Sequence, residues 1–156
     1  MIPTTIGGFV HMAKLMPMLA VEARANDAEI IIIDNGSRDG TASFLSNYDC
    51  TVIINKTNLG FGRGHNQAGK IAQGEYLLLL NNDTTITPGF INEMLKTFDQ
   101  DPAIGIVGCR IYLMDGAKKI QHAGVYFTDG FVPYELGLPI PEFTPGITPD
   151  DPRVRS

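Results

Sequence analysis

The sequence predicts an α/β fold, in which a mostly parallel sheet carries helices on both faces. Three observations support this fold class: short apolar runs recur along the chain, loops rich in Gly, Asn and Asp follow several of them, and segments of helical spacing lie between them. A β-α alternation of this kind is typical of parallel strands joined by crossover helices. With 156 residues, the chain can bury a real core and is expected to form one compact unit.

The first two elements are an incomplete strand and a helix. Residues 2–8 resemble the end of a strand that runs into a loop. Residues 9–23 carry apolar side chains at mostly helical spacing, but Pro17 predicts either a kink or the start of a second helix. The methionines of this segment are expected to fill the core rather than to contact a cofactor.

Two strands are expected next, at residues 29–34 and 50–55. The first is the strongest strand prediction in the chain, because its consecutive isoleucines are β-branched. It ends at Asp34, in a loop where glycines allow tight turns and where Ser37 or Asp39 can cap the next helix.

A glycine-rich loop at residues 58–66 leads to a helix that is expected to end at Gly74, and a central strand follows. The four consecutive leucines at residues 77–80 suit a strand that is covered on both faces. Its carboxyl end would present Asn81 and Asp83 to a cleft, which is where open α/β sheets bind ligands. The alternative is that these polar residues form only a turn after a buried strand.

The remaining segments continue the alternation. A helix is expected over residues 90–98, with Thr87 as its N-cap and Pro88 in its first turn. A further strand is expected at residues 104–110, and Asp115-Gly116 suits a hairpin turn. The predicted organisation is an α/β domain over residues 1–132 and a proline-rich loop or disordered tail over residues 133–156.

Composition and charge exclude several classes of function. A net charge of −5 argues against a general nucleic-acid binder, which needs a basic face. No apolar run approaches the roughly twenty residues that span a bilayer, and no signal sequence precedes the first helix, so a cytoplasmic protein is expected. Cys50 and Cys109 lack the spacing of a zinc or redox site, and both are expected to be buried free thiols.

Two aspartates are the leading candidates for a binding site. The glycine-rich loop misses the dinucleotide spacing because His65 occupies the third glycine position, and no phosphate loop of the Gly-Lys-Ser/Thr type is present. A nicotinamide or ATP site is therefore poorly supported. Asp34 and Asp83 each end a predicted strand, so both would lie at the carboxyl edge of the sheet. One could bond a nucleobase or ribose, and the other could hold a divalent cation that bridges phosphates.

Four motifs together resemble family 2 glycosyltransferases of the GT-A fold, and specifically the rhamnosyltransferase-like branch that builds bacterial surface polysaccharide. The motifs are Asp34-Asn-Gly-Ser-Arg-Asp-Gly-Thr, Asn58-Leu-Gly-Phe-Gly-Arg-Gly-His-Asn, Leu80-Asn-Asn-Asp-Thr and Gln121-His-Ala-Gly. Their order and spacing match the family over roughly residues 2–150.

The resemblance implies a set of site residues. Asp34 corresponds to the aspartate that recognises the base, and Asp83 corresponds to the metal-binding aspartate of the Asp-x-Asp segment, with Asn81 in place of the other acid. Arg63 lies where the glycine-rich loop approaches the donor, although a solvated surface arginine is an almost equal reading. His122 matches the histidine of a His-Ala-Gly motif, for which a structural hydrogen bond is at least as good a reading as catalysis. The implied nucleotide-sugar-binding residues are Thr4, Thr5, Asp34, Asn35, Arg63, Asn66, Asn81 and Asn82, and the implied metal ligand is Asp83.

The resemblance also implies an activity. Family members transfer a sugar with inversion from a UDP-, dTDP- or GDP-sugar to a hydroxyl of a saccharide or lipid-linked acceptor, with Mg²⁺ or Mn²⁺ bound. A carboxylate base is expected in a later segment, but Asp129, Glu135 and Glu142 lie in unsuitable contexts, so no catalytic base is assigned. The chain is therefore expected to be a donor-binding half, truncated at both ends and prone to self-association.

Two alternatives remain open at this point. One is a nucleotide-sugar-binding module that cannot complete the transfer, and the other is a nucleotide-dependent enzyme of another Rossmann class. For the glycosyltransferase hypothesis, the expected location is the cytoplasm or the inner face of the membrane, with at most peripheral membrane association.

Overall fold

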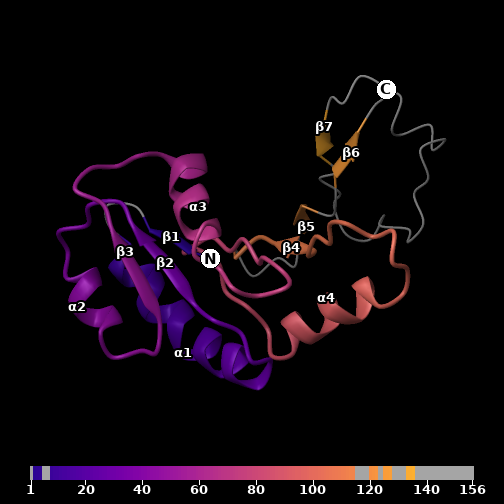
Figure 1. Ribbon diagram of the computed structural model, residues 1–156, viewed down its shortest axis with the longest axis horizontal. Helices are drawn as coiled ribbons and strands as arrows, with labels where there is room; N and C mark the ends of the chain where they lie inside the picture. The colour runs from indigo at the N-terminus through magenta and orange to yellow at the C-terminus, as the bar shows by residue number, and fades with distance from the viewer. Residues whose placement is uncertain (1, 5–7, 115–119, 123–124, 128–132, 136–156) are drawn as a thin grey trace. The chain divides into compact units, whose positions relative to one another are not determined.

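The computed structural model describes residues 2–4, 8–114, 120–122, 125–127 and 133–135 (Figure 1). It divides into two units, residues 1–93 and residues 94–156. In chain order the elements are β1 (Ile2–Thr4), α1 (Phe9–Ala25), β2 (Ile31–Asp34), α2 (Thr41–Leu45), β3 (Thr51–Ile54), α3 (Phe61–Gly69), α4 (Phe90–Phe98), β4 (Ile111–Tyr112), β5 (Ile120–His122), β6 (Val125–Phe127) and β7 (Pro133–Glu135).

The first unit is built on a parallel sheet with the strand order β1-β2-β3. β2 lies in the middle, and its isoleucines are buried on both faces, as expected for a strand between two helical layers. The registers place Thr4 beside Asp34, and Asp34 beside Ile54, so the three strands end together. The predicted parallel α/β architecture is confirmed.

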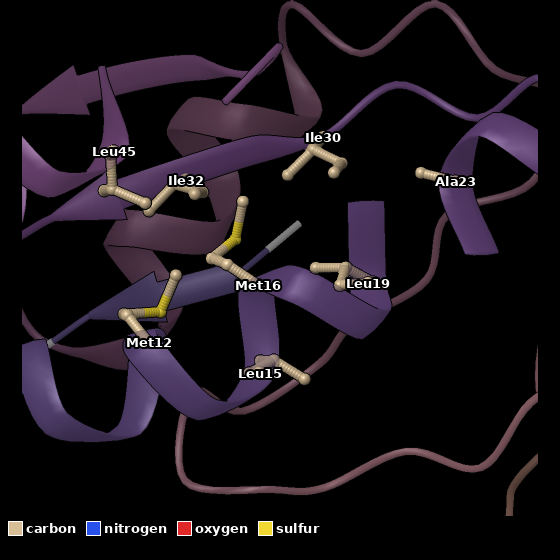
Figure 2. Close-up of a cluster of buried hydrophobic side chains, with 8 residues drawn as sticks. All are labelled: Met12, Leu15, Met16, Leu19, Ala23, Ile30, Ile32 and Leu45. Carbon is tan, nitrogen blue, oxygen red and sulfur yellow. The ribbon is translucent and has the colours of Figure 1, made fainter. Parts of the chain in front are cut away.

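One face of the sheet is covered by α1 and α2. The core on this face consists of side chains from α1, β2 and α2, together with Ile30, which directly precedes β2. Figure 2 shows Met12, Met16 and Leu19 of α1 pointing toward the side of β2 that carries Ile32. Met12 and Met16 have no exposed surface, as predicted for core residues, whereas Met18 is 39% exposed, so the prediction is wrong for this third methionine of α1. α1 continues through Pro17, so the predicted second helix does not form. The proline removes one backbone donor, but the packed face on both sides of it keeps the helix continuous.

The other face is covered by α3, whose Ala68 packs with Ile31 and Ile33 (Figure 1). The helix begins at Phe61, inside the glycine-rich segment, and ends at Gly69, so the predicted end at Gly74 is wrong. The early start has a packing reason: a Cβ on Gly64 would lie 3.3 Å from the Ile33 side chain. Only a helix that carries glycine at this position can lie so close to the sheet.

The strand predicted at residues 77–80 does not form. These residues adopt no regular structure; Leu77 and Leu79 are each 57% exposed, while Leu80 packs against the α1 core. A strand requires a neighbouring strand for its backbone groups, and in the described residues β1 is only three residues long and pairs with β2. An apolar run alone could not reveal whether such a neighbouring strand is present.

The segments after this run differ in detail from the prediction. α4 is confirmed, but it starts at Phe90, after Gly89 with a φ of 81°, so Pro88 does not lie in its first turn. The strand predicted at residues 104–110 is wrong, since these residues carry no regular structure. β4 and β5 pair antiparallel, as the predicted hairpin requires, although Asp115-Gly116 lies outside the described residues.

The last described elements belong to the second unit, and the two cysteines lie one in each unit. β6 and β7 pair antiparallel, and the predicted boundary between residues 132 and 133 stays a prediction. Both cysteines are free thiols, but Cys50 is half-buried and Cys109 is exposed, so the expected burial of Cys109 is wrong. Among the described residues, no helix has the length and apolar character of a membrane span.

Candidate functional site

The carboxyl edge of the sheet holds Asp34 in a fixed orientation. Asp34 is 1% exposed and ends β2. Its Oδ1 accepts a hydrogen bond of 2.7 Å from the Ser37 backbone N–H, and its own backbone carbonyl accepts one of 2.8 Å from the Asn55 N–H. Among the described residues, no hydrogen bond to its Oδ2 is found. Thr4 is its neighbour in β1, whereas Thr5 lies outside the described residues.

The loop after Asp34 is held by a second aspartate. The carboxylate of Asp39 accepts hydrogen bonds from the hydroxyl and the N–H of Thr41, the first residue of α2, and one of 3.1 Å from the N–H of Phe9, the first residue of α1. The Thr41 hydroxyl, followed by the Phe9 amide, lowers the pKa of Asp39 from its ordinary value. Asp39 therefore ties the start of both helices to the loop.

An amide cluster joins the ends of β2 and β3 to α3. The Asn55 side-chain amide donates to Asn35 Oδ1 at 2.9 Å and to Gln67 Oε1 at 2.8 Å, and Gln67 Nε2 donates back to Asn55 Oδ1 at 3.0 Å. Asn35 is 2% exposed. Sequence reasoning identified Asn35 but missed the other two members of the cluster, Asn55 and Gln67. Asn55 directly follows a strand and could have been found by that position, whereas nothing in the sequence marks Gln67.

α3 presents two of the predicted residues to solvent. Arg63 and Asn66 are exposed, while His65 between them is buried. The His65 ring packs against the Phe61 ring with centroids 4.0 Å apart, and its Nδ1 lies 2.9 Å from the Phe61 carbonyl oxygen. Because a carbonyl oxygen only accepts, Nδ1 carries the proton and His65 serves the helix itself.

Residues 81–83 lie in a loop, not at the end of a strand. Asn81 and Asp83 are exposed and Asn82 is half-buried. The Thr84 hydroxyl donates to the Asn81 carbonyl at 2.7 Å, which is the turn that the alternative interpretation of this segment expected. The structure thus places Asp83 differently from the sequence prediction.

Whether residues 81–83 can bind a divalent cation depends on which other groups would supply the remaining ligands. In the described part of the chain, no three His, Cys, Asp or Glu side chains lie close enough together to hold a metal. Mg²⁺ in nucleotide sites is commonly bound by one or two carboxylates, with phosphate oxygens and waters as the other ligands. The exposed Asp83, beside side chains with amide and hydroxyl oxygens, suits that shared kind of coordination and not a cation held by protein alone.

One of the histidines singled out in the sequence, His122, lies in the second unit. His122 is half-buried and lies in β5, in register with Ile111 of β4. Among the acidic residues considered for the base, Asp129 and Glu142 lie outside the described residues, and Glu135 ends β7.

Comparison with known proteins supplies the family. The family described as Glycosyl transferase family 2 matches residues 19–146. The O-antigen biosynthesis protein RfbC of Myxococcus xanthus is 31% identical over 119 residues, which is 73% of this chain and 9% of that protein. An uncharacterized glycosyltransferase of Haemophilus influenzae is 26% identical over 127 residues, 81% of this chain and 42% of that protein. The chain thus spans less than half of either relative.

Solved structures support the same assignment at the level of the fold. The crystal structure of S. aureus TarS, residues 1–349, in complex with UDP, has a TM-score of 0.58 at 19% identity and covers 74% of this chain and 41% of that chain. This likeness confirms the GT-A-type α/β fold. With the match over residues 19–146, the chain belongs to glycosyl transferase family 2.

Proposed function

We propose that this chain binds the nucleotide diphosphate sugar of an inverting family 2 glycosyltransferase. The observation that carries the proposal is the buried Asp34 at the carboxyl edge, with one oxygen held by Ser37 and the other available to an N–H of a nucleobase. A charge-assisted hydrogen bond in so buried a position is strong and directional. The complex of the structurally similar TarS with UDP supports a uridine diphosphate as the first ligand to test.

The other site residues receive roles from their places in the fold. Thr4, beside Asp34 in the sheet, and Thr5 after it would contact the nucleotide, and Asn35 would shape its pocket through the amide cluster. Arg63 and Asn66 are exposed on α3 and could approach the donor's phosphates or sugar. Asn81 and Asn82 would contact the donor from the loop that carries Asp83.

Asp83 is the residue that would meet a divalent cation, Mg²⁺ or Mn²⁺, carried in by the diphosphate. Bound there, such a cation would stabilise the negative charge of the departing diphosphate. Asp83 would supply one oxygen ligand and orient the diphosphate, whereas Asn81 adds no charge.

The acceptor and the pathway are proposed from the relatives. RfbC is named for O-antigen biosynthesis, and a poly-β-1,6-N-acetyl-D-glucosamine synthase of Staphylococcus epidermidis is 34% identical over 85 residues, 52% of this chain and 21% of that protein. A saccharide or lipid-linked hydroxyl as acceptor, in surface polysaccharide synthesis at the cytoplasmic face of the membrane, fits both names. The second candidate is a nucleotide-sugar-binding module that does not turn over.

Nucleotide titration tests the donor site. We expect UDP to bind in the presence of Mn²⁺. Asp34→Asn should weaken this binding at least tenfold, because an N–H of the ligand loses its charged acceptor. Asp83→Asn should remove the effect of Mn²⁺ on UDP binding. Isothermal titration calorimetry with UDP, dTDP and GDP measures both effects.

The matched control is Asp49→Asn, which removes the same charge from an exposed residue before β3, at the opposite edge of the sheet. Binding that survives Asp34→Asn, or that Asp49→Asn weakens equally, would count against the proposed site. A transfer assay with a nucleotide sugar and a saccharide acceptor separates the two candidate functions, since product formed by this chain excludes the module.

A further inference from the structure

Glu22 is a buried carboxylate that the proposed function does not use. It lies on α1 among the apolar residues that face the sheet, and it is 6% exposed. Its Oε1 accepts a hydrogen bond of 2.6 Å from the Gly89 backbone N–H, 67 residues further along the chain. Its Oε2 is buried and has no hydrogen-bond partner among the described residues. Burying a carboxylate in this way costs free energy, and the hydrogen bond from the Gly89 N–H offsets part of that cost.

Gly89 lies at the junction between the Asp83 loop and α4. Its φ of 81° is a left-handed conformation, and its carbonyl accepts the Glu93 N–H at 3.1 Å in the first turn of α4. Glu22 therefore fixes the point at which the loop enters the helix. The hydrogen bond to a charged acceptor is stronger than one to a neutral oxygen.

The loop that carries Asp83 is anchored on both sides of that residue. Leu80 before it and Ile86 after it pack against the same core as Leu19 and Ala23 of α1. Glu22 lies on the same helix, one turn beyond Leu19, and adds the third attachment at Gly89. Between Leu80 and Ile86, the exposed loop is closed by the turn at Asn81. Residues on both sides of Asp83 are thus attached to α1 or to the core that it helps to form.

We propose that Glu22 is a positioning residue for Asp83. By holding the loop's exit, it presents the exposed carboxylate of Asp83 in one place before a cation and diphosphate arrive, and this lowers the ordering cost of binding them. The inference rests on the proposed function only in the identity of the ligand, a diphosphate with its cation. The attachment of the loop to α1 stands on the contacts themselves.

The test compares Glu22→Met with Glu22→Gln. Methionine fills a similar volume but cannot accept the Gly89 N–H, whereas glutamine keeps the acceptor and loses only the charge. We expect Glu22→Met to weaken UDP binding in Mn²⁺ about five- to tenfold and to leave UDP binding in EDTA unchanged, with Glu22→Gln within about twofold of the wild type. A purely structural role would shift the melting temperature without changing the Mn²⁺ dependence.

Amide hydrogen exchange gives a second result that does not need a ligand. We expect Glu22→Met to accelerate exchange in residues 81–89 and to leave β3 (Thr51–Ile54) as in the wild type. If Glu22→Met does not fold, Glu22→Asp retracts the acceptor while keeping the charge, and the same results are expected. Unchanged exchange in residues 81–89 of a folded variant overturns the attachment, and unchanged Mn²⁺-dependent binding overturns the positioning role. Failure of the wild type to bind UDP refutes the proposed function instead, while exchange still decides the attachment.

Discussion

Asp34 and Asp39 lie in one loop and serve different purposes. Asp34 is buried at the end of β2 and accepts the Ser37 N–H, whereas Asp39 accepts hydrogen bonds from three donors of α1 and α2. Sequence reasoning offered Ser37 or Asp39 as the cap of the next helix, but the N-cap position of α2 is Gly40. Asp39 lies one residue before it and accepts hydrogen bonds from Thr41. Ser37 instead donates its N–H to Asp34, and its hydroxyl oxygen is buried without a partner among the described residues. Residue type alone could not distinguish the aspartate that is a candidate for ligand binding from the structural one.

Asp39 makes the stability of the first unit depend on acid pH. The hydroxyl of Thr41 and the amide of Phe9 hold the pKa of Asp39 below its ordinary value. A carboxyl group whose pKa is lower in the folded state contributes stability above its unfolded pKa, which is about 3.9, and that contribution is lost as the pH falls through the folded pKa. We therefore expect Asp39→Asn to lose less stability than the wild type between about pH 5 and pH 3.

Urea unfolding followed by circular dichroism at both pH values measures this difference. Asp49→Asn, with the same change in net charge at an exposed position, should keep the acid sensitivity of the wild type. Equal acid sensitivity in wild type and Asp39→Asn would contradict the role given to Asp39.

At the scale of elements, α3 shows how one glycine decides where a helix packs. Gly62 and Gly64 both lie inside α3, where glycine is unfavourable by roughly 1 kcal/mol relative to alanine. A Cβ on Gly62 would meet no atom within 4 Å, whereas one on Gly64 would lie 3.3 Å from the Ile33 side chain. Ile33 is fully buried in the middle strand, so it cannot move aside without disturbing the core.

The two glycines therefore give a matched pair of substitutions. We expect Gly62→Ala to raise the free energy of unfolding by about 0.5–1 kcal/mol, because only helix propensity changes. Gly64→Ala gains the same propensity but strains the α3–sheet contact, and should be less stable than Gly62→Ala by about 1–3 kcal/mol. Chemical denaturation measures both, and equal stabilities would mean that α3 can shift away from β2 without cost.

The leucine run shows the limit of an apolar pattern at this scale. Consecutive leucines predicted a buried central strand, yet in the structure Leu80 is packed and Leu77 and Leu79 are exposed. Burial on both faces needs a paired strand and two covering layers, and these come from elsewhere in the chain. The same reason explains the strand that was predicted at residues 104–110 and is not present.

For the molecule as a whole, the exposed apolar side chains of residues 71–79 predict self-association. Ile71, Tyr76, Leu77 and Leu79 lie close together in sequence and are 45–57% exposed. Exposed apolar groups in one segment favour association with a second copy. We expect the mass measured by sedimentation velocity to rise with concentration, and Leu77→Lys/Leu79→Lys to reduce that rise without lowering the melting temperature.

The control is Val10→Lys/Val21→Lys, which adds the same charge at exposed positions on α1. It should leave association unchanged. A wild type that stays monomeric at all concentrations, or a control that abolishes association equally, would argue against the segment as the contact.

The sequence by itself determined the fold class, the β-α alternation around β2 and the family resemblance, because these depend on local composition and motif order. It also named Asp34 and Asp83 as the leading candidates for a binding site, which stays a prediction. Only the tertiary structure decided which aspartate is structural, where α3 begins, and that the Asp83 loop is attached to α1 through Glu22. Each of these depends on a contact between residues far apart in the chain, and Glu22, which lies 67 residues from Gly89, carries no local pattern that would reveal its burial.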